Sequence, residues 1–354
     1  MAPFRTIIFG AGNIGTALAG ALSTLPDCEV TLADNTDEAL DTARAMGLQA
    51  RFKAGYLPED LRTMASGQDL IVAARPDRAV PEIARLAADL QTHYLDFSRP
   101  APETLEALSQ LSKSRAVMTG CGASPGLVET LATDLVGQFS RVDELTVRVG
   151  AIPCQAINRL GYGRIWNMNG LLDEYLSPSA AIRDGQPVMI TPLEGYERFL
   201  LGGAPYEAFV TAGGMTDMLA DSDVPVGNLT FKTIRHPGHL DYMLFLLDDL
   251  GLRKRRDMLT ALLSNGLPVV DDDEVIFFLS GRGEIDGEVH ERAVFHRLSP
   301  AFQSGRFNAL IRVAAAYAAT LIGLLKNGHL DPAGFIRHRK LPVATFLGNE
   351  FMRR

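Results

Sequence analysis

Thr6-Ile7-Ile8-Phe9-Gly10-Ala11-Gly12-Asn13-Ile14-Gly15 is the stretch that decides the fold, because an apolar run leads directly into Gly-x-Gly-x-x-Gly. The apolar run predicts a strand that is buried on both faces, as in a parallel sheet. The glycines allow a tight turn, a close approach to a pyrophosphate, and packing of the next helix against the strand. Helical spacing of apolar residues predicts that helix, with Ile14, Ala17, Leu18, Ala21, Leu22 and Leu25 on one face.

An acidic residue lies at the position where such a motif has the residue that binds the ribose of the cofactor. Residues 29–33 predict a second strand, and Asp34 follows it about 20 residues after the last glycine, the usual position for the acid that binds a ribose 2′-OH. The alternative is an ordinary strand–helix turn with a capping aspartate. A carboxylate would repel a 2′-phosphate, and Asn35 rather than an arginine follows, so we expect NAD rather than NADP. The cofactor-binding residues expected from this reading are Gly10, Gly12, Asn13, Ile14, Gly15, Asp34, Ala74 and Arg75.

Strand and helix patterns alternate through the first 120 residues. Further strands are predicted at 48–52, 69–74, 93–97 and 116–118, and helices at 35–47, 58–65, 79–89 and 102–112. Asn35 and Glu38 form a plausible N-cap and third-position pair for the first of these helices. The alternation predicts an α/β fold with a Rossmann-type, doubly wound parallel sheet over residues 1–120.

The pattern changes after a glycine- and proline-rich loop at 119–126. Residues 121–304 predict a second, α+β domain with a mostly antiparallel sheet, whose strands lie at 145–149, 180–182, 188–190, 206–211, 229–234, 275–279 and 289–295. One helix is predicted from Pro237 to Gly251. A long apolar helix at 307–325 is expected to return to the first domain, so residues 305–354 would complete it.

Composition limits the classes of function. The net charge of −8 and the isoelectric point near 5.4 argue against nucleic-acid binding, and the basic run at 253–256 fits a surface helix better. The three cysteines have no CxxC spacing, which predicts neither a disulfide framework nor a zinc site. No signal peptide and no apolar run of about 18 residues is recognised, so we expect no membrane span and a cytoplasmic location.

Several motifs outside the first domain resemble one family. They are Gly120-Cys121-Gly122-x-x-Pro125-Gly126, Asn158-Arg159-Leu160-Gly161-Tyr162 followed by Trp166, Gly170-Leu171-Leu172-x-Glu174-Tyr175, the run from Lys232 to His239, and Phe346-Leu347-Gly348-Asn349. With the glycine motif, they make the chain similar to the saccharopine dehydrogenase and lysine 6-dehydrogenase family over nearly its whole length. The resemblance implies an NAD(P)-linked oxidation of an amine to an imine that water opens, and homodimers.

Seven residues are candidates for the chemistry. Asp96 ends the fifth strand and could accept a proton or hold a substrate ammonium, or it could cap the following loop. Cys121 is a second catalytic candidate, or a buried thiol. His239 could shuttle protons, or be a capping or core histidine. Arg235 matches the family's strand-end arginine and is expected to bind a substrate carboxylate with its planar fork. Tyr162, Trp166 and Asn169 are expected to line the substrate wall, with a core anchor as the alternative for Trp166.

The sequence therefore predicts an NAD(P)-dependent amino-acid dehydrogenase acting on lysine, saccharopine or a related amine. Two alternatives stay open at this point, a catalytically silent NAD-binding sensor and an opine or polyamine-precursor reductase. The expected partners are a small amino-acid substrate and a second copy of the chain, and no metal is expected.

Overall fold

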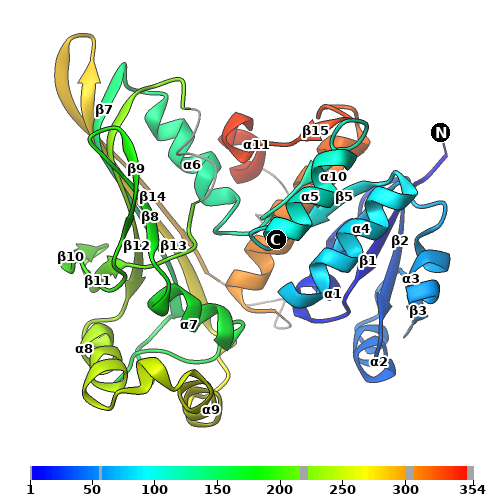
Figure 1. The fold of residues 1–354 in the computed structure, drawn as a ribbon, viewed down its shortest axis with the longest axis horizontal. Helices are drawn as coiled ribbons and strands as arrows, with labels where there is room; N and C mark the ends of the chain where they lie inside the picture. The colour runs from blue at the N-terminus through cyan, green and yellow to red at the C-terminus, as the bar shows by residue number, and fades with distance from the viewer. Residues whose placement is uncertain (1, 56–57, 216–221, 300–306, 349–354) are drawn as a thin grey trace. The chain divides into compact units, whose positions relative to one another are not determined.

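A computed structural model describes residues 2–55, 58–215, 222–299 and 307–348 (Figure 1). The chain divides into two compact units, the first formed by Met1–Leu127 with Ile311–Arg354 and the second by Val128–Leu310. The predicted boundary at residue 305 and the motif residue Asn349 lie outside the described residues. Each unit has its own sheet and its own hydrophobic core.

The described sheet of the first unit has seven strands, all paired in parallel, in the order β15-β6-β5-β4-β1-β2-β3. These strands are β1 Phe4–Phe9, β2 Cys28–Asp34, β3 Arg51–Ala54, β4 Leu70–Ala73, β5 His93–Asp96, β6 Ala116–Met118 and β15 Gly334–Phe335. The chain runs from β1 to β2 and β3 on one side of β1 and then crosses back to β4 on the other side. The carboxyl ends of β1 and β4 therefore form the topological switch point, where doubly wound folds bind ligands. The predicted Rossmann-type sheet is confirmed.

Helices surround this sheet. They are α1 Asn13–Leu22, α2 Asp37–Ala45, α3 Pro58–Ala65, α4 Val80–Leu90, α5 Pro102–Leu111, α10 Ala309–Lys326 and α11 Val343–Leu347. Figure 1 shows α4 and α5 lying over the strands of the sheet. Apolar residues of α3, α4 and α5 form one core with Ile7 and Phe9 of β1 and Ile71 of β4. Ile8 and Val72, which alternate with them, are equally buried. Both faces of the central strands are thus covered, as the continuous apolar run predicts.

Two local predictions in the first unit were wrong, and one strand was not predicted. The third strand begins at Arg51 rather than at residue 48. Helix α2 has Thr36 rather than Asn35 at its N-cap, because the Asp34 carboxylate holds the N–H and hydroxyl of Thr36 and places it there. Strand β15 was not predicted, since a two-residue strand has no periodicity to detect.

The second unit contains a mixed sheet. The path β10-β11-β12-β7-β13-β14 is antiparallel except for the β12–β7 pair, and the β8–β9 hairpin joins it at β12. The strands are β7 Arg141–Pro153, β8 Ser179–Arg183, β9 Gln186–Ile190, β10 Glu197–Leu201, β11 Ala204–Val210, β12 Val226–Arg235, β13 Asp273–Ile285 and β14 Glu288–Leu298. The α+β prediction is confirmed, although β10 was not predicted.

The helices of this part are α6 Leu127–Val136, α7 Met168–Leu176, α8 His239–Leu244 and α9 Arg256–Gly266. The single helix predicted up to Gly251 is wrong, because α8 passes into a π-helical turn at Phe245–Asp249. The wider turn changes which residues share the buried face. Leu247 is fully buried, whereas Leu250, near the end of the predicted helix, is half exposed.

Helix α10 corrects the statement that the chain has no apolar run long enough to cross a membrane. It has 18 residues and a mean hydropathy of 1.6, which satisfies the length and composition of a membrane span. However, 78% of it is buried within the protein, as in the core helix of a globular fold. The described residues therefore give no support for a membrane protein.

Candidate functional site

The glycine turn, residues 10–15, follows β1 and requires glycine at two positions for its own packing. Gly10 has a φ of +119°, and a Cβ atom there would collide with the carbonyl oxygen of Ala74. A Cβ atom at Gly15 would collide with the carbonyl oxygen of Gly10. At Gly12, by contrast, φ is −72° and a Cβ atom would meet no atom within 4 Å. Packing explains Gly10 and Gly15, whereas the glycine at position 12 fits the close approach of a ligand.

Asp34, at the end of β2, is bonded to this turn. Its Oδ2 accepts a hydrogen bond from the N–H of Ala11 at 2.8 Å. Its Oδ1 accepts from the N–H and the hydroxyl of Thr36 at 3.0 and 2.9 Å. The carboxylate is therefore held beside the turn, where the ribose of a dinucleotide would lie if the turn binds the pyrophosphate.

The other predicted cofactor residues lie at the same sheet edge. Asn13 and Ile14 open α1, whose N-cap residue is Gly12, so no side chain caps the first amides of the helix. Such amides form an anion-binding site. Ala74 follows β4 directly and donates its N–H to the carbonyl of Phe9 at 2.9 Å, and Arg75 comes next. These residues follow β1 and β4, the two strands of the switch point, and they fit a nicotinamide dinucleotide.

Asp96 and Cys121 meet within the first unit. The buried Asp96 accepts hydrogen bonds at 3.0 Å from the hydroxyl of Tyr94 and from the N–H of Gly120. Its carbonyl accepts the N–H of Cys121 at 2.9 Å. Burial, followed by the charge of Asp96, holds the pKa of Tyr94 well above its usual value. The carboxylate therefore organises the loop that carries Cys121, and Tyr94 is a member of this group that the sequence did not single out.

The second unit contains a group that we call the arginine cluster, formed by Glu174, Tyr162, Tyr175, Arg235 and His239. Arg235 ends β12, and its Nε donates to the Tyr175 hydroxyl at 2.9 Å. Its Nη2 donates to Oε2 of Glu174 at 3.3 Å. Its Nη1 donates to the carbonyl of Ile234 at 2.9 Å and to the Thr233 hydroxyl at 3.5 Å. The guanidinium is thus fixed in one orientation by the protein itself.

Aromatic rings complete the surroundings of Arg235. Its guanidinium carbon lies 4.8 Å from the ring centre of Tyr162 and 5.7 Å from that of Tyr175, within the range of cation–π attraction. Trp166 donates its indole N–H to the hydroxyl of Tyr162 at 3.2 Å. Trp166 is 37% exposed, so it is not a core anchor. Three of the four predicted substrate-binding residues, Tyr162, Trp166 and Arg235, therefore lie together.

Asn169 is the fourth, and it stands apart from these contacts. It lies in the first turn of α7, where its N–H donates to the side chain of Asn167 at 3.0 Å. Its carbonyl accepts from Arg256 at 2.9 Å. The residue is exposed, and no contact of its side chain within the described residues links it to the cluster.

His239 is buried, and both of its ring nitrogens are occupied. Nδ1 lies 2.8 Å from the carbonyl of Leu160 and Nε2 lies 2.9 Å from the hydroxyl of Tyr175. Since a carbonyl can only accept, Nδ1 carries the proton and Nε2 accepts from Tyr175. Burial, followed by the charge of Arg235, lowers the pKa of His239 to about 3. This geometry fits the core-histidine alternative better than a proton shuttle.

The pH dependence of stability tests this assignment. Because the pKa of His239 is lower in the folded chain than the ordinary 6.5, the unfolded chain binds a proton that the folded chain does not, and stability is lost as pH falls below 6.5. Between pH 6.5 and 5 this single group should cost about 1.4 kcal/mol per pH unit. Urea unfolding across that range should show a shallower loss for His239→Gln than for the wild type. Parallel curves would contradict a neutral, buried imidazole. The wild type must be compared with His239→Gln because other groups also change stability over this range. Glu174 and Asp273 have raised pKa values, so they stabilise the folded chain as pH falls, opposite to His239.

Glu174 and Tyr175 were not predicted as site residues, although both belong to a quoted motif. Burial raises the pKa of Glu174 to about 7, against the opposing effect of Arg235. Glu174 lies 61 positions before the arginine that it contacts. Nothing in the local pattern of α7 indicates that pairing, so only the resemblance marked these residues.

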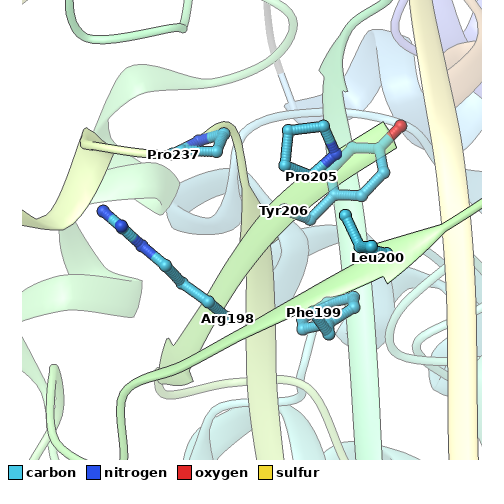
Figure 2. A pocket seen from close by; sticks show the side chains of 6 residues that line it. All are labelled: Arg198, Phe199, Leu200, Pro205, Tyr206 and Pro237. Atoms are coloured by element: carbon cyan, nitrogen blue, oxygen red, sulfur yellow. The ribbon is translucent and has the colours of Figure 1, made fainter. Parts of the chain in front are cut away.

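A separate apolar pocket lies at the β10–β11 hairpin, and its volume is about 390 Å³ (Figure 2). Its lining residues are Arg198, Phe199, Leu200, Pro205, Tyr206 and Pro237. The predicted site residues are absent from this lining. Within the described residues, no group of three or more histidine, cysteine or acidic residues could hold a metal ion.

Comparison with known proteins identifies relatives of both parts of the chain. Residues 6–116 match the family model described as saccharopine dehydrogenase NADP binding domain, and residues 122–338 match saccharopine dehydrogenase C-terminal domain. An apo saccharopine dehydrogenase (L-Glu forming) from Saccharomyces cerevisiae is similar over 97% of this chain and 96% of its own, with a TM-score of 0.81 and 15% identity. A myo-inositol dehydrogenase from Corynebacterium glutamicum covers 99% of this chain and 95% of its own at 14% identity, and its TM-score is only 0.47. At these identities, the first likeness shows the fold and the second carries no argument.

Proposed function

The chain belongs to the saccharopine dehydrogenase family, and from this premise we propose that it is an NAD-dependent dehydrogenase of an amino-acid amine. In the oxidative direction, the C–H bond beside nitrogen breaks and its electron pair leaves as hydride. The nitrogen loses a proton, a C=N bond forms, and water opens the resulting imine. NAD supplies the hydride acceptor, and the protein supplies binding, orientation and proton transfer. The proposed substrates are lysine, saccharopine or a related amine.

The glycine turn with Asp34 is the observation that carries this proposal. Gly12 has room for a side chain yet has none, and the Asp34 carboxylate is bonded to the N–H of Ala11 in the same turn. Uncapped amides at the start of α1 complete an anion-binding edge. Together these features support a dinucleotide whose pyrophosphate lies on the turn and whose ribose is bound by Asp34.

Three residues are proposed to act on the substrate. Asp96 or Cys121 would accept the proton that the nitrogen releases, since both are buried and Asp96, at the end of β5, is hydrogen-bonded to the loop that carries Cys121. Arg235 would bind a substrate carboxylate. Its Nη2 makes one hydrogen bond within the described residues, to Glu174, which leaves a second N–H for a ligand. His239 would only position Tyr175 and Arg235.

Reduction of NAD with a panel of amines tests the function. Lysine, saccharopine and related amino acids should each be offered with NAD and with NADP, and the absorbance of the reduced nicotinamide followed. Turnover with at least one amine is expected. Tight NAD binding with no turnover of any amine would instead favour an NAD-binding sensor.

Asp34 should set both the affinity for NAD and the choice of cofactor. Asp34→Ala removes two ribose hydrogen bonds to a charged group, so we expect KM for NAD to rise about 10- to 100-fold and KM for the amine to change little. The ratio of kcat/KM for NADP to that for NAD should rise, because the carboxylate no longer repels a 2′-phosphate. The family description names NADP, which makes this ratio the decisive quantity.

The matched control is Glu38→Gln, which removes one negative charge from the exposed start of α2. It should leave both Michaelis constants and the cofactor ratio unchanged. Equal increases of the two Michaelis constants in Asp34→Ala would remove Asp34 from the ribose site.

A further inference from the structure

Glu174 is the acidic side chain of the arginine cluster, and it reaches the surface. Its side chain is 25% exposed, whereas that of Arg235 is 3% exposed. Oε2 accepts from Nη2 of Arg235 at 3.3 Å. Oε1 makes no hydrogen bond within the described residues, and it is not one of the fully buried unpartnered atoms. The cluster therefore presents one carboxylate oxygen with free acceptor capacity.

The hydroxyl of Tyr175 and both ring nitrogens of His239 are hydrogen-bonded within the protein. The Tyr175 hydroxyl accepts from Arg235 and donates to His239. The Tyr162 hydroxyl accepts from Trp166, and His239 is bonded through both nitrogens. The groups left for a ligand are therefore Oε1 of Glu174, the remaining N–H of Arg235 and the O–H of Tyr162, which has no acceptor among the described residues. The first two belong to an anion and a cation that lie side by side.

We propose that Glu174 binds the α-ammonium group of the amino-acid substrate, beside the carboxylate that Arg235 binds. This assignment rests on the proposed function. An α-amino acid carries its ammonium and its carboxylate on the same carbon, so these two charged groups are neighbours. The side chains proposed to bind them are neighbours too, since Oε2 of Glu174 lies 3.3 Å from Nη2 of Arg235. An ionised carboxylate only accepts hydrogen bonds. It therefore binds an ammonium, which donates them, and repels a second carboxylate.

Burial sets the range of pH over which the carboxylate can act. The pKa of Glu174 is raised to about 7 by burial, and Arg235 opposes that rise. The other ionisable groups around it are Tyr162 and Tyr175, whose pKa values burial also raises, so neither is ionised near neutral pH. Asp173, its neighbour on α7, points to an exposed ion pair with Arg256. Binding of an ammonium should therefore strengthen as pH rises through about 7.

Calorimetric binding of L-lysine to the protein saturated with NADH tests the assignment without turnover. Glu174→Gln keeps the shape of the side chain and an oxygen that Arg235 can bond, but loses the charge. We expect L-lysine to bind about 10- to 100-fold more weakly to this variant, the effect of one charged hydrogen bond. Asp173→Asn, the adjacent carboxylate of α7, is the matched control and should bind as the wild type does.

Two further comparisons separate a ligand contact from a structural role. The rise of affinity between pH 6 and 8 should disappear in Glu174→Gln and persist in Asp173→Asn. With ε-aminocaproate, which lacks the α-ammonium, wild type and Glu174→Gln should bind equally weakly. If Glu174→Gln weakened the binding of L-lysine and of ε-aminocaproate by the same factor, the variant would have a general structural defect. That result would overturn the proposal.

The outcomes also distinguish this inference from the proposed function. Wild-type turnover together with unchanged L-lysine affinity in Glu174→Gln would overturn the role of Glu174 and leave the dehydrogenase function standing. No turnover with any amine, but L-lysine binding that depends on Glu174, would overturn the function and keep the binding role. No binding of L-lysine to the wild type would overturn the assignment directly.

Discussion

Replacing Gly12 with alanine should weaken the binding of NAD by about 10- to 100-fold, because forcing an extra methyl group into a packed contact typically costs about 1–3 kcal/mol. The new methyl group would meet no protein atom within 4 Å, and φ of −72° suits any residue. The fold therefore tolerates the change, and stability should move by no more than about 1 kcal/mol, because the gain through the unfolded state opposes the weaker N-cap that alanine makes. The loss of affinity would come from the pyrophosphate, which needs the space that the methyl group takes.

Two matched variants make this result specific, with NAD affinity and the unfolding midpoint measured for each. Gly10→Ala should lower both quantities, since its Cβ collides with the carbonyl of Ala74 and its φ is +119°. Gly266→Ala, at the end of α9 with no atom within 4 Å of the new methyl group, should leave NAD affinity unchanged and keep or slightly raise the unfolding midpoint. Unchanged NAD affinity in Gly12→Ala would show that the pyrophosphate does not lie on this turn.

Removing Arg235 should have the largest effect on stability in the second unit. Arg235→Met leaves Glu174 without its cation and Tyr175 without its donor, and it removes two cation–π contacts. Removing one partner of a buried ion pair lowers the free energy of unfolding by about 3–5 kcal/mol. Because Glu174 is partly exposed, we expect a loss at the lower end of this range, about 3 kcal/mol. The free energy of unfolding in urea measures it.

The double variant shows whether the cost comes from the stranded carboxylate. Arg235→Met with Glu174→Gln should recover part of the loss, with a coupling energy of about 0.5–3 kcal/mol for two groups in direct contact. Strict additivity of the two single variants would mean that the pair contributes nothing as a pair. The amine affinity should not recover in the double variant, since both ligand groups are then missing.

The sequence predicted best those features that are encoded locally. The apolar run of β1, the glycine turn and Asp34 lie within one strand–helix–strand segment, so their spacing alone indicated their arrangement. The central strands β1 and β4 are buried on both faces and therefore have continuous apolar runs in the sequence. β15, with two residues, has no pattern to read, and the π-helical turn after α8 alters a helix whose apolar spacing looks regular.

The arginine cluster was less predictable, because its contacts join residues that are far apart in the sequence. Arg235 and His239 were singled out from a motif at the end of β12, whereas Glu174 and Tyr175 were not. The bonds from Arg235 to these two residues span 61 and 60 positions. No periodicity of α7 distinguishes a carboxylate that faces an arginine from one that faces solvent, as Asp173 does. The low pKa of His239 likewise depends on burial by residues that the local sequence does not reveal.

The transfer of deuterium from an amine-bearing carbon to the cofactor is the most direct measurement of the proposed reaction. The protein would be incubated with NAD and with amino acids that carry deuterium on each amine-bearing carbon, and the reduced cofactor analysed by mass spectrometry. We expect the reduced nicotinamide to carry one deuterium, taken from the carbon that becomes the imine. Reduced cofactor without deuterium, or bound NAD that no labelled amine reduces, would contradict a hydride-transferring amine dehydrogenase.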